Sequence, residues 1–181
     1  MVGSDDIMRV WFTSDTHFGA ERTRVLSKRP FETVAEMDEC LITNWNTLVG
    51  ENDDVYHLGD FGDYVTLSKL NGNVHLIKGN YEYHDGYTDA DFLEMGFISV
   101  HDTLTETFLY NHEAIKFSMA HKPSDTCKIY DCLFGHVHKL SMLKRFGLNV
   151  GTDCHNFRPI NLDTVMFYIN NIKYYDDEVF L

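Results

Sequence analysis

Short hydrophobic runs, each followed by a polar stretch that contains glycine, recur along the first half of the chain. They cover residues 8–13, 54–58 and 74–77, and in the first run apolar side chains occupy both sides of the alternation. A strand that is buried on both faces has this pattern, whereas a strand with one wet face alternates. We therefore predict three buried strands that end in exposed loops.

Helical periodicity is clearest between residues 33 and 50. Thr33 and Glu36 have the spacing of a capping box, and apolar residues then recur three and four positions apart until Gly50. A shorter helix is predicted over residues 88–95. A late helix is expected after Asn161, whose side chain can cap it.

The second half of the chain has shorter strand signals and a more antiparallel character. A turn at residues 111–113 separates two of the predicted strands. The predicted strands of this half cover residues 97–100, 103–109, 115–120, 132–134 and 148–150. Strands and helices therefore alternate in the first half only, and the chain as a whole is of the α/β class.

Length and composition are those of one globular domain, which we expect to cover residues 1–181. The chain is 44% hydrophobic, and Asp5 and Asp6 stand where a leader sequence would carry basic residues. No window is apolar enough for a membrane span, and the four cysteines form no C-x-x-C pair. We expect free thiols, a cytoplasmic location and no membrane partner; the oligomeric state is left open.

The charge of the chain bears on its partners. The formal net charge is −13 at pH 7, with 28 acidic against 15 basic residues. A nucleic-acid surface normally carries clustered Lys and Arg, so this balance argues against a nucleic-acid partner. Bound divalent cations would offset part of the negative charge.

Polar side chains that can bind metal ions recur where the predicted strands end. Seven of them follow one another along the chain: Asp15, His17, Asp60, Asn80, His121, His136 and His138. Strand ends of open α/β sheets share one crevice, and oxygen and imidazole donors without thiolate suit Mn²⁺, Fe or Zn²⁺. Seven donors are too many for one tetrahedral ion, but they fit two ions about 3.5 to 4 Å apart that share a carboxylate.

Local spacing supports this interpretation. Asp15 and His17 are one residue apart, as are His136 and His138, and alternate residues of an extended chain face the same side. Glycines at positions 59, 79 and 135 are expected to let the backbone turn sharply beside the ions.

The motifs that carry these residues resemble those of a known family. They are D-x-H at Asp15, G-D at Asp60, G-N at Asn80, a lone His121 and G-H-x-H at His136. In this order and spacing, over roughly residues 10–151, the chain resembles the calcineurin-like metallophosphoesterase superfamily. The segments FTSDTHFG, RPFETVAEMDE and VYHLGDFG also resemble a compact, mostly bacterial and phage branch of it.

The resemblance implies a fold, a metal centre and an activity. The implied fold is a four-layer αββα sandwich of two mixed β-sheets flanked by helices. The implied cofactors are two divalent ions (Mn, Fe, Zn or Ni, with Mn favoured). The implied activity is hydrolysis of phosphate mono- or diesters by a dinuclear metal-hydroxide mechanism. The implied substrate is a small phosphorylated molecule. One ion would take Asp15, His17, Asp60 and His138, and the other Asp60, Asn80, His121 and His136, with Asp60 as the bridge.

The segment KGNYEYHD departs from the family's usual G-N-H-[DE]. Tyr81 stands where the family has a histidine that is thought to protonate the leaving group, and Glu82 stands at the acidic position. Some compact relatives also lack that histidine and resemble phosphodiesterases. With an ordinary pKa of about 10 against about 6.5 for histidine, Tyr81 is expected to position substrate, unless His84 supplies the proton. Phosphodiesters should then react somewhat faster than simple alkyl monoesters.

Two other functions are consistent with the same motifs. One is a non-catalytic scaffold for protein interaction, since the retromer complex contains a subunit of similar size and fold, and the other is a nuclease. Complete ligand positions favour catalysis over the scaffold, and the acidic balance disfavours the nuclease. Arg22, Arg24 and Arg29 either line the crevice or belong to a solvated loop. The remaining histidines are expected to be structural or at the surface: His57, His75, His101, His112 and His155.

Overall fold

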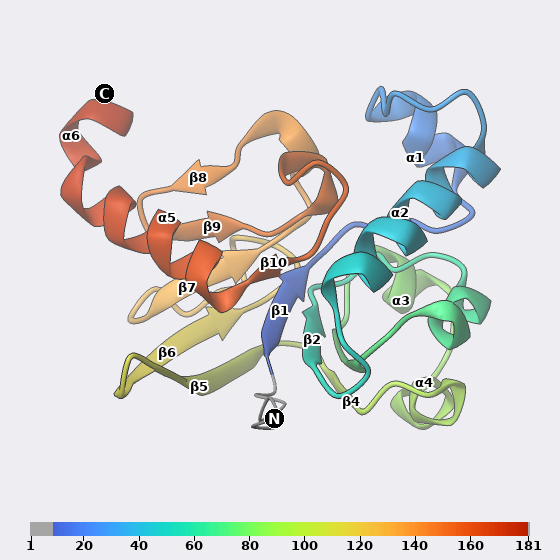
Figure 1. The fold of residues 1–181 in the computed structure, drawn as a ribbon, viewed down its shortest axis with the longest axis horizontal. Helices are drawn as coiled ribbons and strands as arrows, with labels where there is room; N and C mark the ends of the chain where they lie inside the picture. The colour runs from blue at the N-terminus through green and yellow to red at the C-terminus, as the bar shows by residue number, and fades with distance from the viewer. Residues whose placement is uncertain (1–8, 181) are drawn as a thin grey trace, which may run out of the picture.

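The computed structural model describes residues 9–180, which form two five-stranded sheets (Figure 1). The first sheet has the order β10-β1-β2-β3-β4. Its strands are β1 (Val10–Thr13), β2 (Asp54–His57), β3 (Asn73–Ile77), β4 (Ser99–His101) and β10 (Ile160–Asn161). Strands β1 to β4 run parallel, and β10 is antiparallel to β1. The loops that follow β1, β2 and β3 therefore emerge at the same edge.

The second sheet has the order β5-β6-β7-β9-β8 and is also mixed. Its strands are β5 (Leu104–Tyr110), β6 (Glu113–Met119), β7 (Asp131–Phe134), β8 (Leu143–Lys144) and β9 (Gly147–Asn149). β6, β7 and β9 run parallel, while β5 and β8 are antiparallel to their neighbours. An isolated parallel bridge between Ser14 and Gly151 joins the loops that follow β1 and β9. The carboxyl ends of both sheets thus meet.

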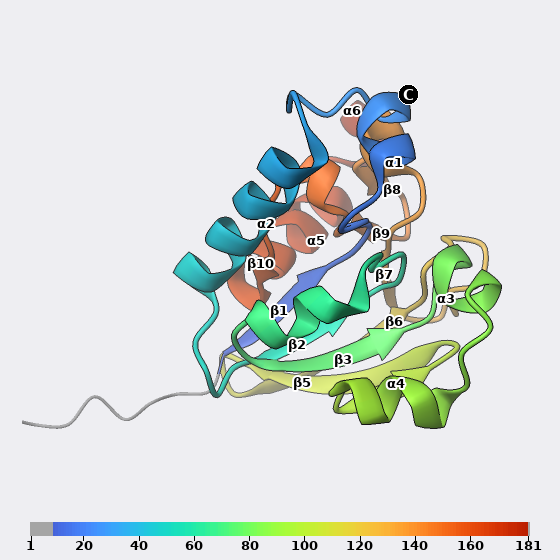
Figure 2. The ribbon, with the colours of Figure 1, turned by 90° about the vertical axis from the view of Figure 1, so that its right-hand side faces the viewer.

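Helices flank the sheets. The α-helices are α1 (Glu21–Leu26), α2 (Val34–Leu48), α3 (Asn80–His84), α4 (Asp89–Met95), α5 (Leu162–Tyr174) and α6 (Asp176–Val179), and the 3₁₀ turns are η1 (Tyr64–Lys69), η2 (His138–Leu140) and η3 (Thr152–Cys154). In Figure 2, α1 and α3 lie at the end of the molecule toward which β1 and β3 point. Between residues 9 and 180, no helix combines the length and hydropathy needed to cross a membrane.

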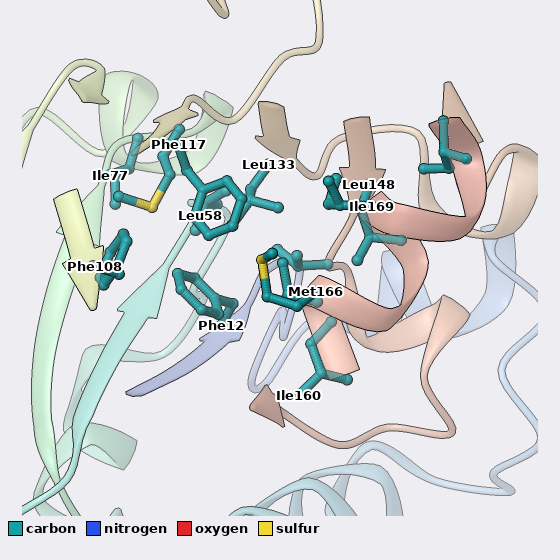
Figure 3. Packing of buried hydrophobic residues seen from close by; sticks show 14 residues of the cluster. Phe12, Leu58, Ile77, Phe108, Phe117, Leu133, Leu148, Ile160, Met166 and Ile169 are labelled. Carbon is teal, nitrogen blue, oxygen red and sulfur yellow. The ribbon is translucent and has the colours of Figure 1, made fainter. Parts of the chain in front are cut away.

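Two hydrophobic cores lie on opposite faces of the first sheet. On the face toward the second sheet, Phe12 packs edge to face against Phe108 and Phe117, with ring centroids 5.5 and 6.1 Å apart (Figure 3). Helix α5 completes this core with residues that include Met166. On the other face, Trp11 belongs to the core that α2 covers. Neighbouring residues of β1 therefore enter different cores, which confirms the strand buried on both faces.

The predicted fold class is confirmed: two mixed sheets flanked by helices. The predicted strands of the first half correspond to β1, β2 and β3, although Met8 lies outside the described residues, as do Asp5 and Asp6. Helix α2 begins as predicted, because Thr33 Oγ1 accepts a hydrogen bond from the Glu36 N–H at 3.1 Å. The capping box is incomplete, however, since the Glu36 carboxylate accepts from the Glu32 N–H.

Three local predictions need correction. The strand expected at 97–100 in the antiparallel half is β4, which pairs in parallel with β3 in the first sheet. The sharp turn expected at Asn80 is the first turn of helix α3, and the segment around Arg22 forms helix α1. All four cysteines fall within the described residues and are free, as predicted.

Candidate metal centre

The seven predicted ligands lie together at the edge where the carboxyl ends of the two sheets meet. The Asp60 carboxylate occupies the middle: its Oδ2 is 3.5 Å from His17 Nε2 and 3.5 Å from His121 Nε2. Farther along, His121 Nε2 is 3.2 Å from His136 Nδ1, which is 3.3 Å from Asn80 Nδ2. Residues from five segments, separated by up to 123 positions in the chain, therefore form one cluster.

Two overlapping groups in this cluster have the geometry to hold a metal ion. They are Asp15, His17 and His138, and Asp15, Asp60 and His121, and within each group one donor atom per residue lies within 4.8 Å of the others. Asp15 is thus common to both groups, whereas the family pattern shares Asp60. Asp60 nonetheless keeps the position between the two histidines that it contacts.

An unpartnered buried side chain indicates that the donors of the cluster suit divalent cations. His17 is buried, yet among the described residues neither of its ring nitrogens has a hydrogen-bond partner. A buried, unpartnered polar atom is costly in a folded protein, so such an atom calls for an explanation. Its Nε2 lies 3.8 Å from Asp15 Oδ1 as well as close to Asp60. A cation bound among these carboxylates would satisfy the nitrogen.

Burial keeps the imidazoles of His17 and His136 in the form that binds cations. Burial, helped by the charge of Arg29, holds the pKa of His17 well below its ordinary value. Burial and the neighbouring His121 also lower the pKa of His136. A neutral imidazole keeps a lone pair, which a metal ligand requires. Burial raises the pKa of Asp15, against the opposing effects of His121 and His138.

The backbone at the cluster adopts an uncommon conformation. Five of the seven residues have a positive φ: Asp15 (56°), His17 (51°), Asp60 (57°), His136 (70°) and His138 (47°). The left-handed region costs a residue with a Cβ about 1–2 kcal/mol, and such strain gathers at functional sites. The extended conformation expected for the two closely spaced pairs is therefore wrong.

The left-handed turns send the members of one pair to different parts of the cluster. The His138 ring stacks on the His17 ring with centroids 5.2 Å apart, while His136 lies against His121. The two histidines of G-H-x-H therefore lie beside different histidines of the cluster.

Glycines make room for the close approach of the loops. Gly59 has a φ of 83°, which favours glycine, and supports the expected turn before Asp60. Gly135 acts differently, because a Cβ there would collide with Ser14 and Asp15. This glycine is needed for close packing of the two sheet ends and not for a left-handed turn.

Hydrogen bonds outside the cluster fix the orientation of the ligands. His121 Nδ1 donates to the Leu58 carbonyl at 2.8 Å, which leaves Nε2 free of a proton in the neutral ring. The Asp15 carboxylate accepts from Ser14 Oγ at 2.7 Å and from the His136 N–H at 2.9 Å. Partners of this kind set the tautomer and angle of metal ligands.

Asp153 orients His138, a role that no sequence motif indicates. Its carboxylate accepts a 2.7 Å hydrogen bond from His138 Nδ1 and two bonds, of 3.0 and 2.9 Å, from Arg29. Although burial opposes ionisation, these bonds hold the pKa of Asp153 at about 2. Burial of His138 is likewise outweighed by Asp153 and Asp15, so the pKa of His138 is raised. No local motif includes Asp153, because its partners are distant in the chain.

The three arginines after the first motif have different roles. Arg29 is buried and binds Asp153, and Arg24 pairs with Glu21. Arg22 lines a cavity of about 360 Å³ beside the cluster, together with His17 and residues of α1, α3 and η2. Only Arg22 of the three therefore faces the crevice.

Tyr81 and His84, the two candidate proton donors, lie in different surroundings. The Tyr81 ring meets the His17 ring edge to face, with centroids 4.7 Å apart, and its hydroxyl lies 3.5 Å from Thr23 Oγ1. Tyr81 lines the cavity, whereas His84 is exposed at the end of α3 and does not line it. Glu82 is buried and accepts hydrogen bonds from the backbone N–H groups of Asp60 and two other residues. Glu82 thus orients a loop and not the neighbouring tyrosine.

The histidines expected to be structural lie outside both groups with metal-binding geometry: His57, His75, His101, His112 and His155. His57 is buried, and its Nε2 is 2.9 Å from Thr16 Oγ1. His75 and His101 both bond to Ser99. Among residues 9–180 the two groups use only predicted histidines, namely His17, His121 and His138, while His136 lies outside both groups and contacts His121.

Comparisons with known proteins agree with the geometry. Residues 8–167 match the family model described as the calcineurin-like phosphoesterase superfamily domain. The chain is 29% identical over 188 residues to the uncharacterized protein MJ1445 of Methanocaldococcus jannaschii, covering 91% of this chain and 93% of that protein. It is 34% identical over 85 residues to the Gene 66 protein of Mycobacterium phage L5, covering 42% of this chain and 39% of that one.

A solved structure shares the fold. The protein of unknown function AQ665 from Aquifex aeolicus superposes with a TM-score of 0.69 at 20% sequence identity. The superposition covers 90% of this chain and 100% of that one. The similarity extends over both sheets and supports the arrangement described above.

Proposed function

Because the chain belongs to the calcineurin-like phosphoesterase superfamily, we propose that it hydrolyses phosphate esters with the help of two divalent cations. The observation that carries this proposal is the buried His17, whose unpartnered nitrogen lies between the carboxylates of Asp15 and Asp60. A scaffold protein would gain nothing from an unsatisfied buried imidazole. A protein that binds cations there would be stabilised by them.

The proposed ligand sets follow the cluster. Asp15, His17, Asp60 and His138 would hold one cation, and Asp60, Asn80, His121 and His136 the other. When bound, the cations supply Lewis-acid polarisation of the phosphoryl oxygens and acidify water for the attack. The donors suit Mn²⁺, Fe, Zn²⁺ or Ni²⁺, and we favour Mn²⁺.

The other residues of the site orient and bind. Asp153 and Leu58 hold His138 and His121 with Nε2 toward the cluster. Tyr81, on the wall of the cavity, offers a hydroxyl that can donate a hydrogen bond to a substrate oxygen. A phenol is a weak acid near neutrality, so substrates that need little protonation of the leaving group should react best. We therefore propose small phosphodiesters and aryl monoesters as substrates of a cytoplasmic enzyme.

Metal content and turnover test this proposal together. Purified protein should bind two ions per chain in elemental analysis, and chelator should abolish hydrolysis of bis-p-nitrophenyl phosphate, with Mn²⁺ restoring it best. Asp60→Asn should lower kcat by at least about a hundredfold, because it weakens the ligand between His17 and His121. Asp177→Asn, an exposed residue of α6, is the matched control and should leave kcat unchanged.

The alternative functions predict different results. A scaffold would turn over neither bis-p-nitrophenyl phosphate nor p-nitrophenyl phosphate at any metal concentration. A nuclease would cleave plasmid DNA or RNA in preference to the small diester. Full activity of Asp60→Asn, or no more than one ion under saturating metal, would contradict the two-cation proposal.

A further inference from the structure

The cavity beside the proposed metal centre has two kinds of wall. Its inner wall is formed by His17, His138 and Tyr81, which belong to or contact the cluster. Its outer wall comes from α1 and η2, which are far apart in the sequence and both line the cavity. At about 360 Å³ it lies at the small end of the range for small-molecule sites. A molecule in this cavity would therefore touch the metal centre directly.

The outer wall carries exposed apolar side chains. Leu26, the last residue of α1, is 68% exposed, and Leu140, the last residue of η2, is 88% exposed. A single exposed leucine needs no explanation, but two that line one concave opening form an apolar lip. The Tyr81 ring continues this surface toward the cluster. Such a surface favours an apolar group of about the size of one ring.

Two cations stand at the same opening. Arg22 and Lys139 both line the cavity, and neither forms a salt bridge with any carboxylate of residues 9–180. By contrast, Arg24, two residues along the same helix, pairs with Glu21. In a chain with 28 acidic residues, two cations without carboxylate partners at one opening are available to an anionic ligand.

We propose that this cavity, the ester pocket, binds a ring-sized apolar group of the substrate beside its scissile phosphate, and that Arg22 and Lys139 attract a second negative charge of the same molecule. The substrate class is thus small organic phosphate esters that carry an aromatic or similarly flat group and a further anionic group. The proposal rests on the proposed function, because the metal centre would hold the phosphate. Beyond the proposed function, it specifies which groups of the substrate, apart from the phosphate, the side chains of the cavity would bind.

Binding of two phosphonates tests the apolar wall without any turnover. Phenylphosphonate and methylphosphonate present the same anionic group and differ only in the apolar part, and neither contains an ester bond. In calorimetric titrations of the Mn²⁺-loaded protein, phenylphosphonate should bind at least about tenfold more tightly than methylphosphonate. Leu26→Asn combined with Leu140→Asn should reduce this ratio to about threefold or less while methylphosphonate affinity is kept. Leu93→Asn, an exposed leucine of α4, is the control and should retain the parental ratio.

A third phosphonate tests the cations. 4-Carboxyphenylphosphonate should bind more tightly than phenylphosphonate in the parent, and Arg22→Gln combined with Lys139→Gln should remove this advantage. Arg158→Gln, another exposed arginine that does not line the pocket, should preserve it. Loss of the advantage in Arg158→Gln as well would mean that net charge, and not the ester pocket, determines it.

The outcomes separate this proposal from the proposed function. Equal binding of phenylphosphonate and methylphosphonate by a protein that hydrolyses esters overturns the ester pocket and leaves the function standing. Selective binding that the leucine variant abolishes, in a protein that hydrolyses no ester, supports the pocket and overturns catalysis. Failure to bind either phosphonate overturns the ester pocket, and it overturns both proposals only when the protein also hydrolyses no ester.

Discussion

Five proposed ligands have a left-handed backbone, and this conformation determines which substitutions they tolerate. His136 has a φ of 70°, a conformation that glycine adopts without strain but alanine does not. In metal-free protein, His136→Gly should therefore be more stable than His136→Ala by about 1 kcal/mol in urea unfolding. At positions with a negative φ, the alanine variant is normally the more stable of the two. Both variants remove the imidazole, so metal affinity should fall equally in the two.

Tyr81, on the wall of the cavity, is the residue that we propose to position substrate. If it positions substrate, Tyr81→Phe should raise KM more than it lowers kcat, because the lost hydrogen bond is not a proton transfer. Tyr81→His should increase hydrolysis of alkyl monoesters relative to aryl ones. His84→Ala serves as the control, since His84 is exposed and does not line the cavity. If His84→Ala selectively abolishes alkyl monoester hydrolysis, then His84 is the acid and this assignment of Tyr81 is wrong.

The buried His57 should make the free energy of unfolding depend on pH. Burial lowers its pKa from 6.5 to about 3, so the folded protein holds it neutral. The free energy that neutral His57 contributes to stability is therefore complete above pH 6.5. It is lost as the pH falls from 6.5 toward 3, because in this range the unfolded chain binds a proton that the folded protein does not. Between pH 7 and pH 5, chelator-treated parent should lose about 2 kcal/mol more stability than His57→Gln. Equal losses in the two proteins would show that His57 is not held neutral.

At the scale of elements, α3 fixes the loop that follows β2. Glu82 reaches back from α3 and accepts hydrogen bonds from the N–H groups of Asp60, Phe61 and Gly79 at 2.7–2.9 Å. Glu82→Gln keeps the shape but turns an N–H₂ group toward one of these donors. It should destabilise the protein by about 2 kcal/mol and weaken metal binding, because Asp60 lies in the released loop. Calorimetry would measure both effects, and unchanged metal affinity would contradict the role of α3.

Elements whose formation depends on nearby residues can be predicted from the sequence. Helix α2 carries its own periodicity and the Thr33 cap, so it could be found without tertiary information. Strand β4 belongs to the first sheet and not to the antiparallel half that the sequence predicts, because packing between distant segments places it beside β3. Helix α3 was missed because a tertiary bond helps to begin it: the Tyr81 N–H donates to Asp60 Oδ1 at 2.9 Å.

The same distinction applies to the site. The seven proposed ligands can be picked out from the sequence because their motifs recur at strand ends, and parallel strands bring such ends together. Five of them belong to the two groups with metal-binding geometry: Asp15, His17, Asp60, His121 and His138. Asp153 and Arg29 were not found as partners, since nothing local links residues 124 positions apart. The left-handed conformations were also missed. They arise where the chain must turn between two sheets, and spacing alone suggests an extended strand.

At the scale of the whole molecule, the negative charge and the local cations act in opposite directions. The formal net charge of −13 repels anionic substrates at long range, whereas Arg22 and Lys139 attract them within the ester pocket. Salt weakens the long-range field more than short contacts inside a cavity. A small ester that reaches the pocket can benefit from the cations, but a long polyanion must lie along the acidic surface. This contrast is a physical reason to favour small substrates over nucleic acids.

The final prediction concerns the response of catalysis to salt. Screening reduces repulsion in proportion to substrate charge, so raising NaCl from about 0.02 M to about 0.2 M should increase kcat/KM about two- to threefold for dianionic p-nitrophenyl phosphate. The increase should be smaller for monoanionic bis-p-nitrophenyl phosphate. Arg22→Gln combined with Lys139→Gln should make both increases steeper, because the compensating attraction is lost, whereas Arg158→Gln should change them little. A fall in kcat/KM with salt for both substrates would mean that local cations outweigh the net charge, and a nucleic-acid substrate would then regain support.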